Sequence, residues 1–487
     1  MSTPLSRRTL LRGGLGVAAT GLALPAATGT DAWAAPPTDG EIYGAPTTNP
    51  LVWQRADPFV TPRTRGRYYF TASVPEYDRL IVRAAPTIEG LGDAAEAVVW
   101  RRPADGRMGG HIWAPELHRI DGRWYLYFAA GDSDDVFRIR MYVMESTAAD
   151  PRDVSGWSAP RQIVTPWDSF SLDATTFEHR GERYLVWAQS EPEISSNSNL
   201  YIARMTSPFT ITGNPARIAT PTKSWEVQGF RVNEGAAVIK RNGRVFVTFS
   251  ASATDARYCM GLLTADARAD LLDPATWSKN LDPVFTTDEQ TGQYGPGHNS
   301  FTVAEDGETD VLVYHARDYR DIVGDPLYDP NRHARAQRLY WHPDGTPLFG
   351  VPVGRGGPIV RLSPADAPST FVRHHTYALR VDPRVRELAD SQFRFVPGFA
   401  GEGTVSLQSV NFPDRYWRVD GTSLRIEPVG EGDGFGAQAS FRRVPGLANS
   451  NAVSLELSDR RGSYVNHDRG ALTVGRASRA KSTFWLS

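Results

Sequence analysis

The stretch GRWYLYFAA at residues 122–130 decides the fold, because a glycine turn followed by an aromatic and β-branched run recurs through the chain. The other copies are GRYYFTAS at 66–73, GERYLVWAQ at 181–189, GRVFVTFSA at 243–251 and GETDVLVYHA at 307–316. Their glycines are 56, 59, 62 and 64 residues apart. Each copy predicts a β-hairpin, and a repeat of this size, with about four strands, is typical of a propeller blade. We therefore expect an all-β chain in which residues 35–363 form a five-bladed β-propeller.

The repeat also indicates which side chains share a place in space. Asp57, Trp113, Glu234 and His298 lie nine residues before the glycine of their copy, and Asp173 lies eight before. These positions begin the innermost strand of each blade, and innermost strands line the axial channel. A role as turn former would suit the aspartates but not Glu, His and Trp at the same position. We therefore expect the five side chains to converge at one mouth of the channel.

Three carboxylates and a tryptophan in one cavity favour sugar chemistry. Glycoside hydrolysis needs one carboxylic acid to protonate the leaving oxygen and one carboxylate to attack or to activate water. A third carboxylate raises the pKa of the acid by like-charge repulsion. Trp113 offers a flat apolar face to a sugar ring. Metal-dependent hydrolysis would call for several histidine ligands, and His298 alone is too little.

At these residues the chain resembles glycoside hydrolase family 43 over nearly all of residues 45–360. The resemblance implies an inverting mechanism with Asp57 as general base, Asp173 as the carboxylate that tunes and orients the acid, and Glu234 as general acid. Inversion requires the base and acid to be about 6.5–9.5 Å apart. His298 resembles an axial histidine that often sits beside an ion or water, so structural calcium is possible there, although no cofactor is required. Arg317 matches an arginine that contacts sugar hydroxyls.

Within the family, HIWAPELH at 111–118, FSLDATTF at 170–177 and GQYGPGHNSF at 292–301 resemble exo-acting α-L-arabinofuranosidases. The resemblance implies release of terminal arabinofuranose from arabinan, arabino-oligosaccharides or arabinoxylan side chains. Two alternatives stay open in the same family, a β-xylosidase and an endo-arabinanase, because the loops that close or open the channel cannot be read from one sequence. A non-catalytic sugar-binding propeller is the alternative of another class.

A second repeat begins after the propeller. FRFVPGFAGEGTVSL at 393–407 matches FRRVPGLANSNAVSL at 441–455 at an offset of 48 residues. Three such lobes predict a β-trefoil over residues 370–487, and the segment resembles the arabinofuranose-binding modules of carbohydrate-binding family 42. The resemblance implies that Asp390 and His467 hold sugar. No lobe keeps both the expected His and the expected Asp, so targeting of arabinan and a structural spacer both remain open.

The N-terminus and the composition set the compartment and the partners. Residues 1–34 carry a twin-arginine pair at Arg7 and Arg8, an apolar run and an A-x-A cleavage site, which predicts export and secretion; the alternative is a short membrane anchor. The net charge of −2 and the absence of a basic block argue against nucleic acid. Cys259 is the only cysteine and is predicted to be a buried hydrophobe. We expect a monomer without a membrane span that acts on arabinose-containing plant polysaccharides.

Most of the 13 Trp, 18 Tyr and 21 Phe residues repeat in the blade strands. Side chains at such positions are predicted to be core, and they include Tyr68, Tyr69, Trp124, Tyr125 and Trp187. Trp113 differs because it stands at the axial position, and it is the aromatic residue that we expect to meet the sugar.

Overall fold

The computed structural model describes residues 47–430 and 434–487. The predicted export signal at 1–34 lies outside these residues. No helix within the described ranges is long and apolar enough to cross a membrane. Strands dominate, and the helical elements are single turns, of which α2 (Phe435–Gln438) is the one α-helix among the described residues.

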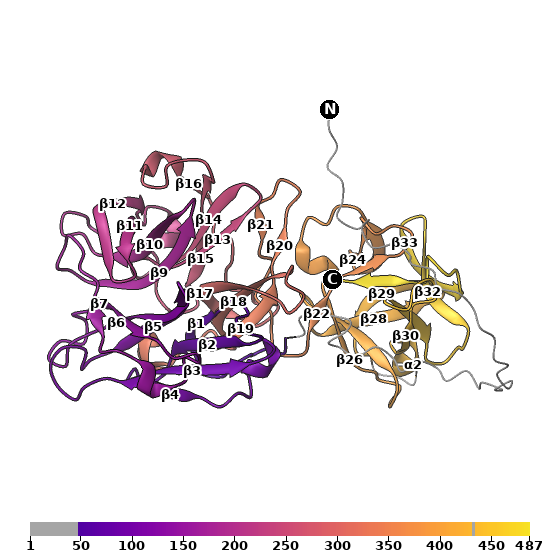
Figure 1. The fold of residues 1–487 in the computed structure, drawn as a ribbon. Helices are drawn as coiled ribbons and strands as arrows, with labels where there is room; N and C mark the ends of the chain where they lie inside the picture. The colour runs from indigo at the N-terminus through magenta and orange to yellow at the C-terminus, as the bar shows by residue number, and fades with distance from the viewer. Residues whose placement is uncertain (1–46, 431–433) are drawn as a thin grey trace, which may run out of the picture. The chain divides into compact units, whose positions relative to one another are not determined.

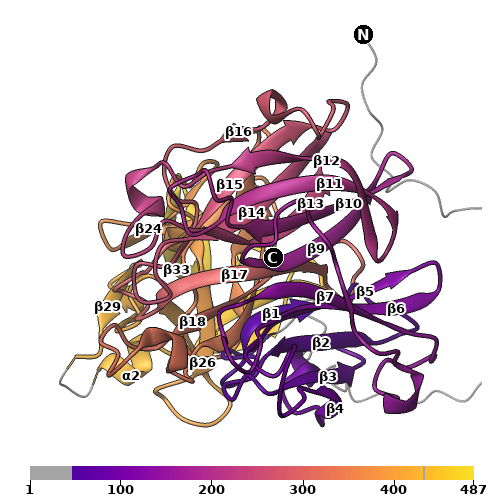
Figure 2. The ribbon, with the colours of Figure 1, turned by 90° about the vertical axis from the view of Figure 1, so that its left-hand side faces the viewer.

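Five consecutive antiparallel sheets confirm the predicted propeller (Figures 1 and 2). In all five sheets the innermost strand comes first in the sequence, and the following strands lie successively further out. The strands are β1 (Ala56–Val60), β2 (Tyr68–Ser73), β3 (Arg79–Ala85) and β4 (Ala97–Arg101); β5 (Ile112–Ile120), β6 (Arg123–Ala130), β7 (Arg140–Ser146) and β8 (Arg161–Gln162); β9 (Ser171–His179), β10 (Glu182–Gln189), β11 (Asn199–Ser207) and β12 (Thr210–Ala219); β13 (Asn233–Arg241), β14 (Arg244–Ala251), β15 (Cys259–Asp266) and β16 (Ser278–Lys279); and β17 (Tyr294–Val303), β18 (Asp310–Arg317) and β19 (His333–Arg338).

The five sheets close into a ring. Each innermost strand contacts the next, and β17 contacts β1. The segment before β1 pairs with β19, since the N–H of Leu51 donates to the carbonyl of Ala334 at 2.8 Å. The first and last blades are therefore joined by main-chain hydrogen bonds, and the innermost strands surround one axis.

The aromatic residues predicted as core are buried. Tyr68, Tyr69, Trp124, Tyr125 and Trp187 are all at most 6% exposed. They pack among the aliphatic side chains of neighbouring sheets, as when Tyr69 meets Trp124 edge to face at 4.9 Å between ring centroids. Cys259 is buried too, as predicted, with its Sγ 3.7 Å from the carbonyl of Trp225. Burial of these rings supplies much of the hydrophobic stabilisation between blades.

The C-terminal strands form one sheet with the three-fold arrangement of a β-trefoil. Three hairpins, β24–β25, β28–β29 and β32–β33, pair with one another through single contacts between β25, β29 and β33. The strands are β22 (Ile359–Val360), β23 (Leu362–Pro364), β24 (Phe371–His375), β25 (Ala378–Asp382), β26 (Phe393–Pro397), β27 (Val405–Ser409), β28 (Arg415–Asp420), β29 (Ser423–Pro428), β30 (Phe441–Pro445), β31 (Val453–Leu457), β32 (Ser463–Asp468), β33 (Ala471–Arg476) and β34 (Phe484–Leu486).

This sheet takes in residues that precede the start expected at 370. Strand β22 pairs with β26, and β23 pairs with the last strand, β34. The sequence repeat could not indicate this, because β22 and β23 are two and three residues long and carry no copy of the lobe motif. The domain limits of 35–363 and 370–487 themselves stay a prediction.

Candidate active site

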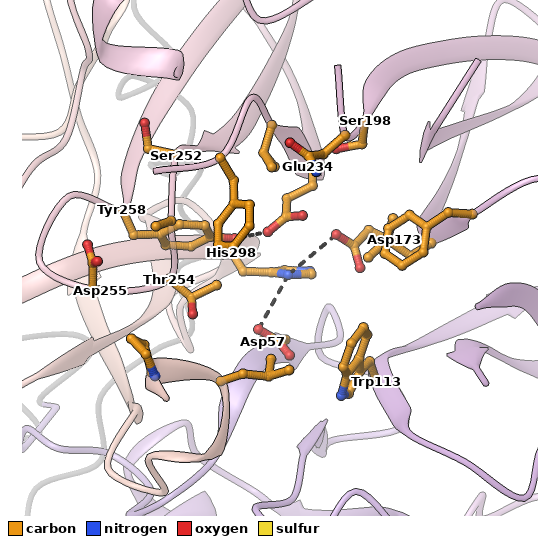
Figure 3. A pocket seen from close by; sticks show the side chains of 18 of the residues that line it. Asp57, Trp113, Asp173, Ser198, Glu234, Ser252, Thr254, Asp255, Tyr258 and His298 are labelled. Carbon is orange, nitrogen blue, oxygen red and sulfur yellow. Dashed lines mark hydrogen bonds and ion pairs between the residues drawn. The ribbon is translucent and has the colours of Figure 1, made fainter. Parts of the chain in front are cut away.

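One pocket of about 800 Å³ is lined by all five side chains that the propeller repeat singled out (Figure 3). Asp57, Asp173, Glu234, His298 and Trp113 come from the starts of the five innermost strands, one from each blade. Asp57 and Asp173 are 8% and 5% exposed, whereas Glu234 is half-buried. Three carboxyl groups and an imidazole therefore face one solvent-accessible cavity.

A β-bulge at the start of every innermost strand aims these side chains. The strand register breaks there in all five blades. One residue at each bulge has a left-handed backbone, with φ of 51° at Asp57, 46° at Ala114, 58° at Asp173, 57° at Gly235 and 37° at His298. Bulges re-aim side chains and are common beside active sites. Trp113 and Glu234 therefore stand one residue before the left-handed position, so the five predicted residues do not share a single register.

The bulges also free main-chain N–H groups, which bind side chains around the pocket. The N–H of Asp57 donates to His315 Nδ1 at 3.0 Å, and that of Ala114 donates to Ser73 Oγ at 2.7 Å. The N–H of Gly235 donates to Asp173 Oδ2 at 2.8 Å. The backbone beside Glu234 is thus fixed directly to the neighbouring carboxylate.

Asp57 is held ionised. Burial by itself would raise its pKa, but His298, Arg332, His315 and the hydrogen bond from Ser73 together lower the pKa of Asp57 to about 2. His298 Nδ1 and an Arg332 nitrogen lie 3.4 and 3.5 Å from Asp57 Oδ1. Ser73 Oγ donates to the other oxygen, Oδ2, at 2.6 Å. A carboxylate in this environment is ionised near neutral pH and can accept a proton from water.

Glu234 is held protonated. Burial and the negative charge of Asp173 raise the pKa of Glu234 well above its usual value. Tyr258 opposes this in part, because its hydroxyl donates to Glu234 Oε1 at 2.9 Å and so stabilises the charged form (Figure 3). Glu234 is therefore the group in the pocket best placed to give a proton near neutral pH.

Asp173 and His298 lie between these two groups. Burial raises the pKa of Asp173, and the charge of Asp57 adds to it. Although burial alone favours neutral imidazole, Asp173 and Asp57 together raise the pKa of His298. The His298 ring is 3.4 Å from Asp57 and 3.9 Å from Asp173 (Figure 3). The imidazole of His298 thus lies between two carboxylates that would otherwise repel each other.

The residues around His298 do not fit a metal ion. Among residues 47–430 and 434–487, no group of three or more His, Cys, Asp or Glu side chains is arranged to hold one. The His298 nitrogen that faces the carboxylates, Nδ1, makes ion-pair contacts with them instead. The possible calcium beside His298 gains no support from this geometry.

Two residues of the site escaped the sequence reasoning, Arg332 and Tyr258. Arg332 lines the pocket, is 6% exposed and donates to the hydroxyl of Tyr77 at 2.8 Å. Tyr258 stacks on the neutral His315 ring, with centroids 5.8 Å apart and planes at 7°. Both lie in loops just before the strands β19 and β15, where the blade repeat has no signal. The pair R-Y before Cys259 was visible in sequence, but nothing there tied Tyr258 to Glu234.

Arg317 lies behind the pocket rather than in its lining. It is 1% exposed, and its guanidinium donates to Asp329 Oδ1 at 3.0 Å and to the carbonyls of Thr254 and Pro326 at 2.7 and 2.8 Å. Thr254 and Pro326 themselves line the pocket. This placement does not support the predicted contact with sugar hydroxyls, because the guanidinium is committed to fixing two pocket loops.

An aromatic wall stands on the Trp113 side of the pocket. His111 stacks on Trp113 at 4.8 Å between centroids, and Tyr77 and Phe137 meet it edge to face. Phe137 is 50% exposed and lines the pocket, as does Phe230, which is 58% exposed. Sugar rings pack on such surfaces through their C–H faces.

In the C-terminal module, Asp390 and His467 lie in different surroundings. Asp390 accepts from Asn411 Nδ2 at 3.0 Å and lies 3.3 Å from both Arg373 and His374, in a hollow that Tyr377 also lines. His467 Nε2 lies 2.7 Å from Asp366 Oδ1. In the third lobe, Lys481 stands where the motif would have an aspartate, and the carboxylate beside His467 comes from Asp366, in the loop after β23.

The comparisons with known proteins agree with this site. The family model described as glycosyl hydrolases family 43 matches residues 47–347, and the alpha-L-arabinofuranosidase B (ABFB) domain matches residues 357–443. An extracellular exo-alpha-(1->5)-L-arabinofuranosidase of Streptomyces avermitilis is 53% identical over 403 residues, which are 83% of this chain and 84% of the relative. Alpha-L-arabinofuranosidase 43 of Humicola insolens is 50% identical over 454 residues, 90% of this chain and 94% of the relative.

A solved structure is similar as well. The crystal structure of alpha-L-arabinofuranosidase from Lactobacillus brevis is 53% identical and matches with a TM-score of 0.62, covering 64% of this chain and 98% of that chain. A thermostable family-43 glycoside hydrolase matches at 24% identity and a TM-score of 0.51, which supports the fold alone.

Proposed function

Because the chain belongs to glycosyl hydrolases family 43, we propose that it is an exo-acting, inverting α-L-arabinofuranosidase. Its substrates are arabinan, arabino-oligosaccharides or arabinoxylan side chains, from which it releases terminal arabinofuranose. The names of three relatives that are at least 50% identical to this chain support the identity of the sugar. Arabinose-containing polysaccharide is therefore the substrate class.

The observation that supports the mechanism is that two carboxyl groups in one pocket have pKa values shifted in opposite directions. The pKa of Asp57 is lowered and that of Glu234 is raised. Asp57, with its pKa of about 2, takes a proton from a water molecule. That water attacks the anomeric carbon on the face opposite the leaving oxygen. Glu234 gives its proton to the leaving oxygen as the bond breaks. The products are free arabinose of inverted configuration and an alcohol, and proton exchange with solvent restores both carboxyl groups.

The remaining residues of the pocket prepare these two for the reaction. Asp173 keeps Glu234 protonated by its charge and binds the N–H of Gly235. Arg332 and His298 keep Asp57 ionised. Trp113 supplies the apolar face for the terminal sugar, and Arg317 holds the loops of Thr254 and Pro326.

Product analysis tests this function. The protein is incubated with linear α-1,5-arabinan, arabinoxylan and nitrophenyl glycosides of arabinose and xylose. We expect arabinose monomer as the sole sugar released, and proton NMR in the first minutes should show the β-anomer. Release of xylose alone would make it a β-xylosidase, a ladder of oligomers an endo-arabinanase, and tight binding without any product a sugar-binding propeller.

We further propose that the C-terminal module binds arabinan through its first lobe. The supporting observation is the cluster around Asp390, in which a carboxylate, His374 and Tyr377 share one hollow. Asp390→Ala should lower the fraction of protein retained on insoluble arabinan while leaving hydrolysis of soluble arabino-oligosaccharides unchanged. Equal retention of the variant and the unaltered protein would contradict sugar binding at this lobe.

Export through the twin-arginine route and a monomeric state complete the proposal. Relatives named extracellular support secretion, and Arg7 and Arg8 support the route. Replacing both arginines with lysine should retain the protein inside the cell, and light scattering of the purified enzyme should give the mass of one chain. Unchanged secretion would point to another export pathway.

A further inference from the structure

A buried ion pair that joins the outermost strand of the fourth blade to the segment before its innermost strand has no part in the chemistry described so far. Lys279, on β16, places its Nζ 2.6 Å from Glu226 Oε1. Their side chains are 15% and 0% exposed. Burying two charges is costly unless each finds further partners, so the other contacts of this pair indicate what it holds.

The contacts lead to the strand that carries Glu234. Asn233, the residue immediately before Glu234, is fully buried. Its Nδ2 donates to Glu226 Oε1 at 3.1 Å, and its Oδ1 accepts from Lys279 Nζ at 3.4 Å. The side-chain amide of Asn233 thus forms hydrogen bonds with both members of the ion pair, and these bonds fix the orientation of the amide.

The same pair fixes the loop before that strand. Glu226 Oε2 accepts from the N–H groups of Thr222 and Lys223 at 2.8 and 2.7 Å, and Lys279 donates to the carbonyl of Thr220 at 2.7 Å. With these bonds, both carboxylate oxygens of Glu226 and the ammonium group of Lys279 have hydrogen-bond partners. Segment 220–223, Glu226 and the start of β13 are therefore held by one cluster.

Between Glu226 and Asn233 runs a short loop, residues 227–232, that forms the pocket wall beside Glu234. Its ends are closed by the bond from the N–H of Val232 to the carbonyl of Glu226 at 3.3 Å. Phe230 and Val232 line the pocket. Because the general acid stands next to the leaving oxygen, this wall borders the leaving group rather than the terminal sugar.

We propose that Lys279 is a positioning residue for Glu234, acting through Glu226 and Asn233. This inference rests on the proposed function, since it requires Glu234 to be the general acid. Proton transfer demands an acid within hydrogen-bond reach of the leaving oxygen, and small displacements of catalytic groups cost large factors in rate. The cluster sets the position of the main chain from which Glu234 projects.

A positioning role has a signature that simple loss of stability does not have. Leaving groups that depart without protonation, such as dinitrophenolate, need no general acid, whereas a sugar alcohol does. Displacement of Glu234 should therefore slow hydrolysis of arabino-oligosaccharides much more than hydrolysis of dinitrophenyl arabinofuranoside. The ratio of the two rates cancels any change in the amount of folded enzyme.

The experiment compares kcat/KM on these two substrates for Lys279→Met and for Glu226→Gln/Lys279→Met in the full chain. The double variant leaves no unpaired charge and so keeps the test open if the single variant folds poorly. We expect the oligosaccharide rate to fall at least tenfold relative to the activated substrate in both variants. Lys279→Arg, which restores a cation, should recover part of the ratio.

Arg241→Met is the matched control. Arg241 ends the same strand, β13, at the far end from Glu234, and pairs with the buried Asp310 at 2.6 Å. Loss of this pair should leave the ratio unchanged. An unchanged ratio in Lys279→Met and in Glu226→Gln/Lys279→Met would refute the positioning role, provided that Glu234→Ala still shows the selective loss. If Glu234→Ala loses both substrates equally, the acid assignment itself fails.

Discussion

Replacing Tyr258 with phenylalanine removes one hydrogen bond from Glu234, the proposed general acid, and leaves the ring in place. The hydroxyl of Tyr258 donates to Glu234 Oε1 at 2.9 Å and so favours the ionised carboxylate. Its ring keeps the stack on His315 in the variant. The change therefore isolates one contribution to the pKa of Glu234.

The size of the effect follows from the charge on the acceptor. A hydrogen bond to a charged group contributes about 1.5–3 kcal/mol, and one pKa unit corresponds to about 1.4 kcal/mol. Since Glu234 is half-buried and water can replace part of the lost bond, the lower end applies. The pKa of Glu234 should rise by about one unit. Because the acid must be protonated to act, the alkaline limb of kcat/KM should move up by about one pH unit.

The assay is the pH profile of kcat/KM on an arabino-oligosaccharide. It is measured from about pH 4 to 10, a range wide enough to show a shift of about one pH unit. Tyr127→Phe is the matched control, because its buried hydroxyl donates to the carbonyl of Pro208 at 2.7 Å outside the pocket. That variant should keep the profile of the unaltered enzyme. An alkaline limb that stays in place or moves down in Tyr258→Phe would refute the assignment of Glu234 as the acid that sets it.

The other predictions concern the base, the bulge, the pocket rim and the C-terminal sheet. Asp57→Asn should lower kcat about 10²–10⁴-fold on natural and activated substrates alike, measured as arabinose release. Gly235→Ala should lower the Tm, by an amount equivalent to about 1–3 kcal/mol, because φ is +57° and a Cβ would lie 3.1 Å from the His298 ring. Phe230→Ala should raise the KM for arabino-oligosaccharides several-fold at nearly constant kcat on nitrophenyl arabinofuranoside. A chain ending at residue 356 should stay soluble and hydrolyse soluble oligosaccharides, whereas one ending at 369 should aggregate, because β22 and β23 would lose their partners.

The sequence repeat predicted the propeller and the meeting of five side chains because both follow from strand order. Five repeated hairpins of this kind are typical of a closed propeller, in which residues near the start of each innermost strand lie at the axial channel. The repeat therefore predicted that Asp57, Asp173 and Glu234 lie in one pocket. The roles assigned to them stay predictions until the variants are measured.

The pocket residues that lie in loops could not be predicted from the sequence repeat, for a physical reason. Arg332 and Tyr258 reach the pocket from loops whose lengths differ between blades, so no repeat position marks them. Arg317 lies on a regular strand, β18, but the loops of Thr254 and Pro326 fold over it and take its donors. The sequence also could not show that Trp113 and Glu234 stand one residue before the left-handed position of their bulges, because a bulge has no recognisable sequence pattern.

The five bulges give each blade two consecutive positions that can reach the pocket. Blades one, three and five use the left-handed residue, and blades two and four use the residue before it. Neighbouring Cα atoms are about 3.8 Å apart, which is close to the difference between the carboxyl spacings of retaining and inverting glycosidases. Each bulge therefore offers the pocket two neighbouring main-chain positions for a side chain. Substitutions confined to the bulges can alter the spacing of the carboxyl groups while the strands of the sheets keep their sequence.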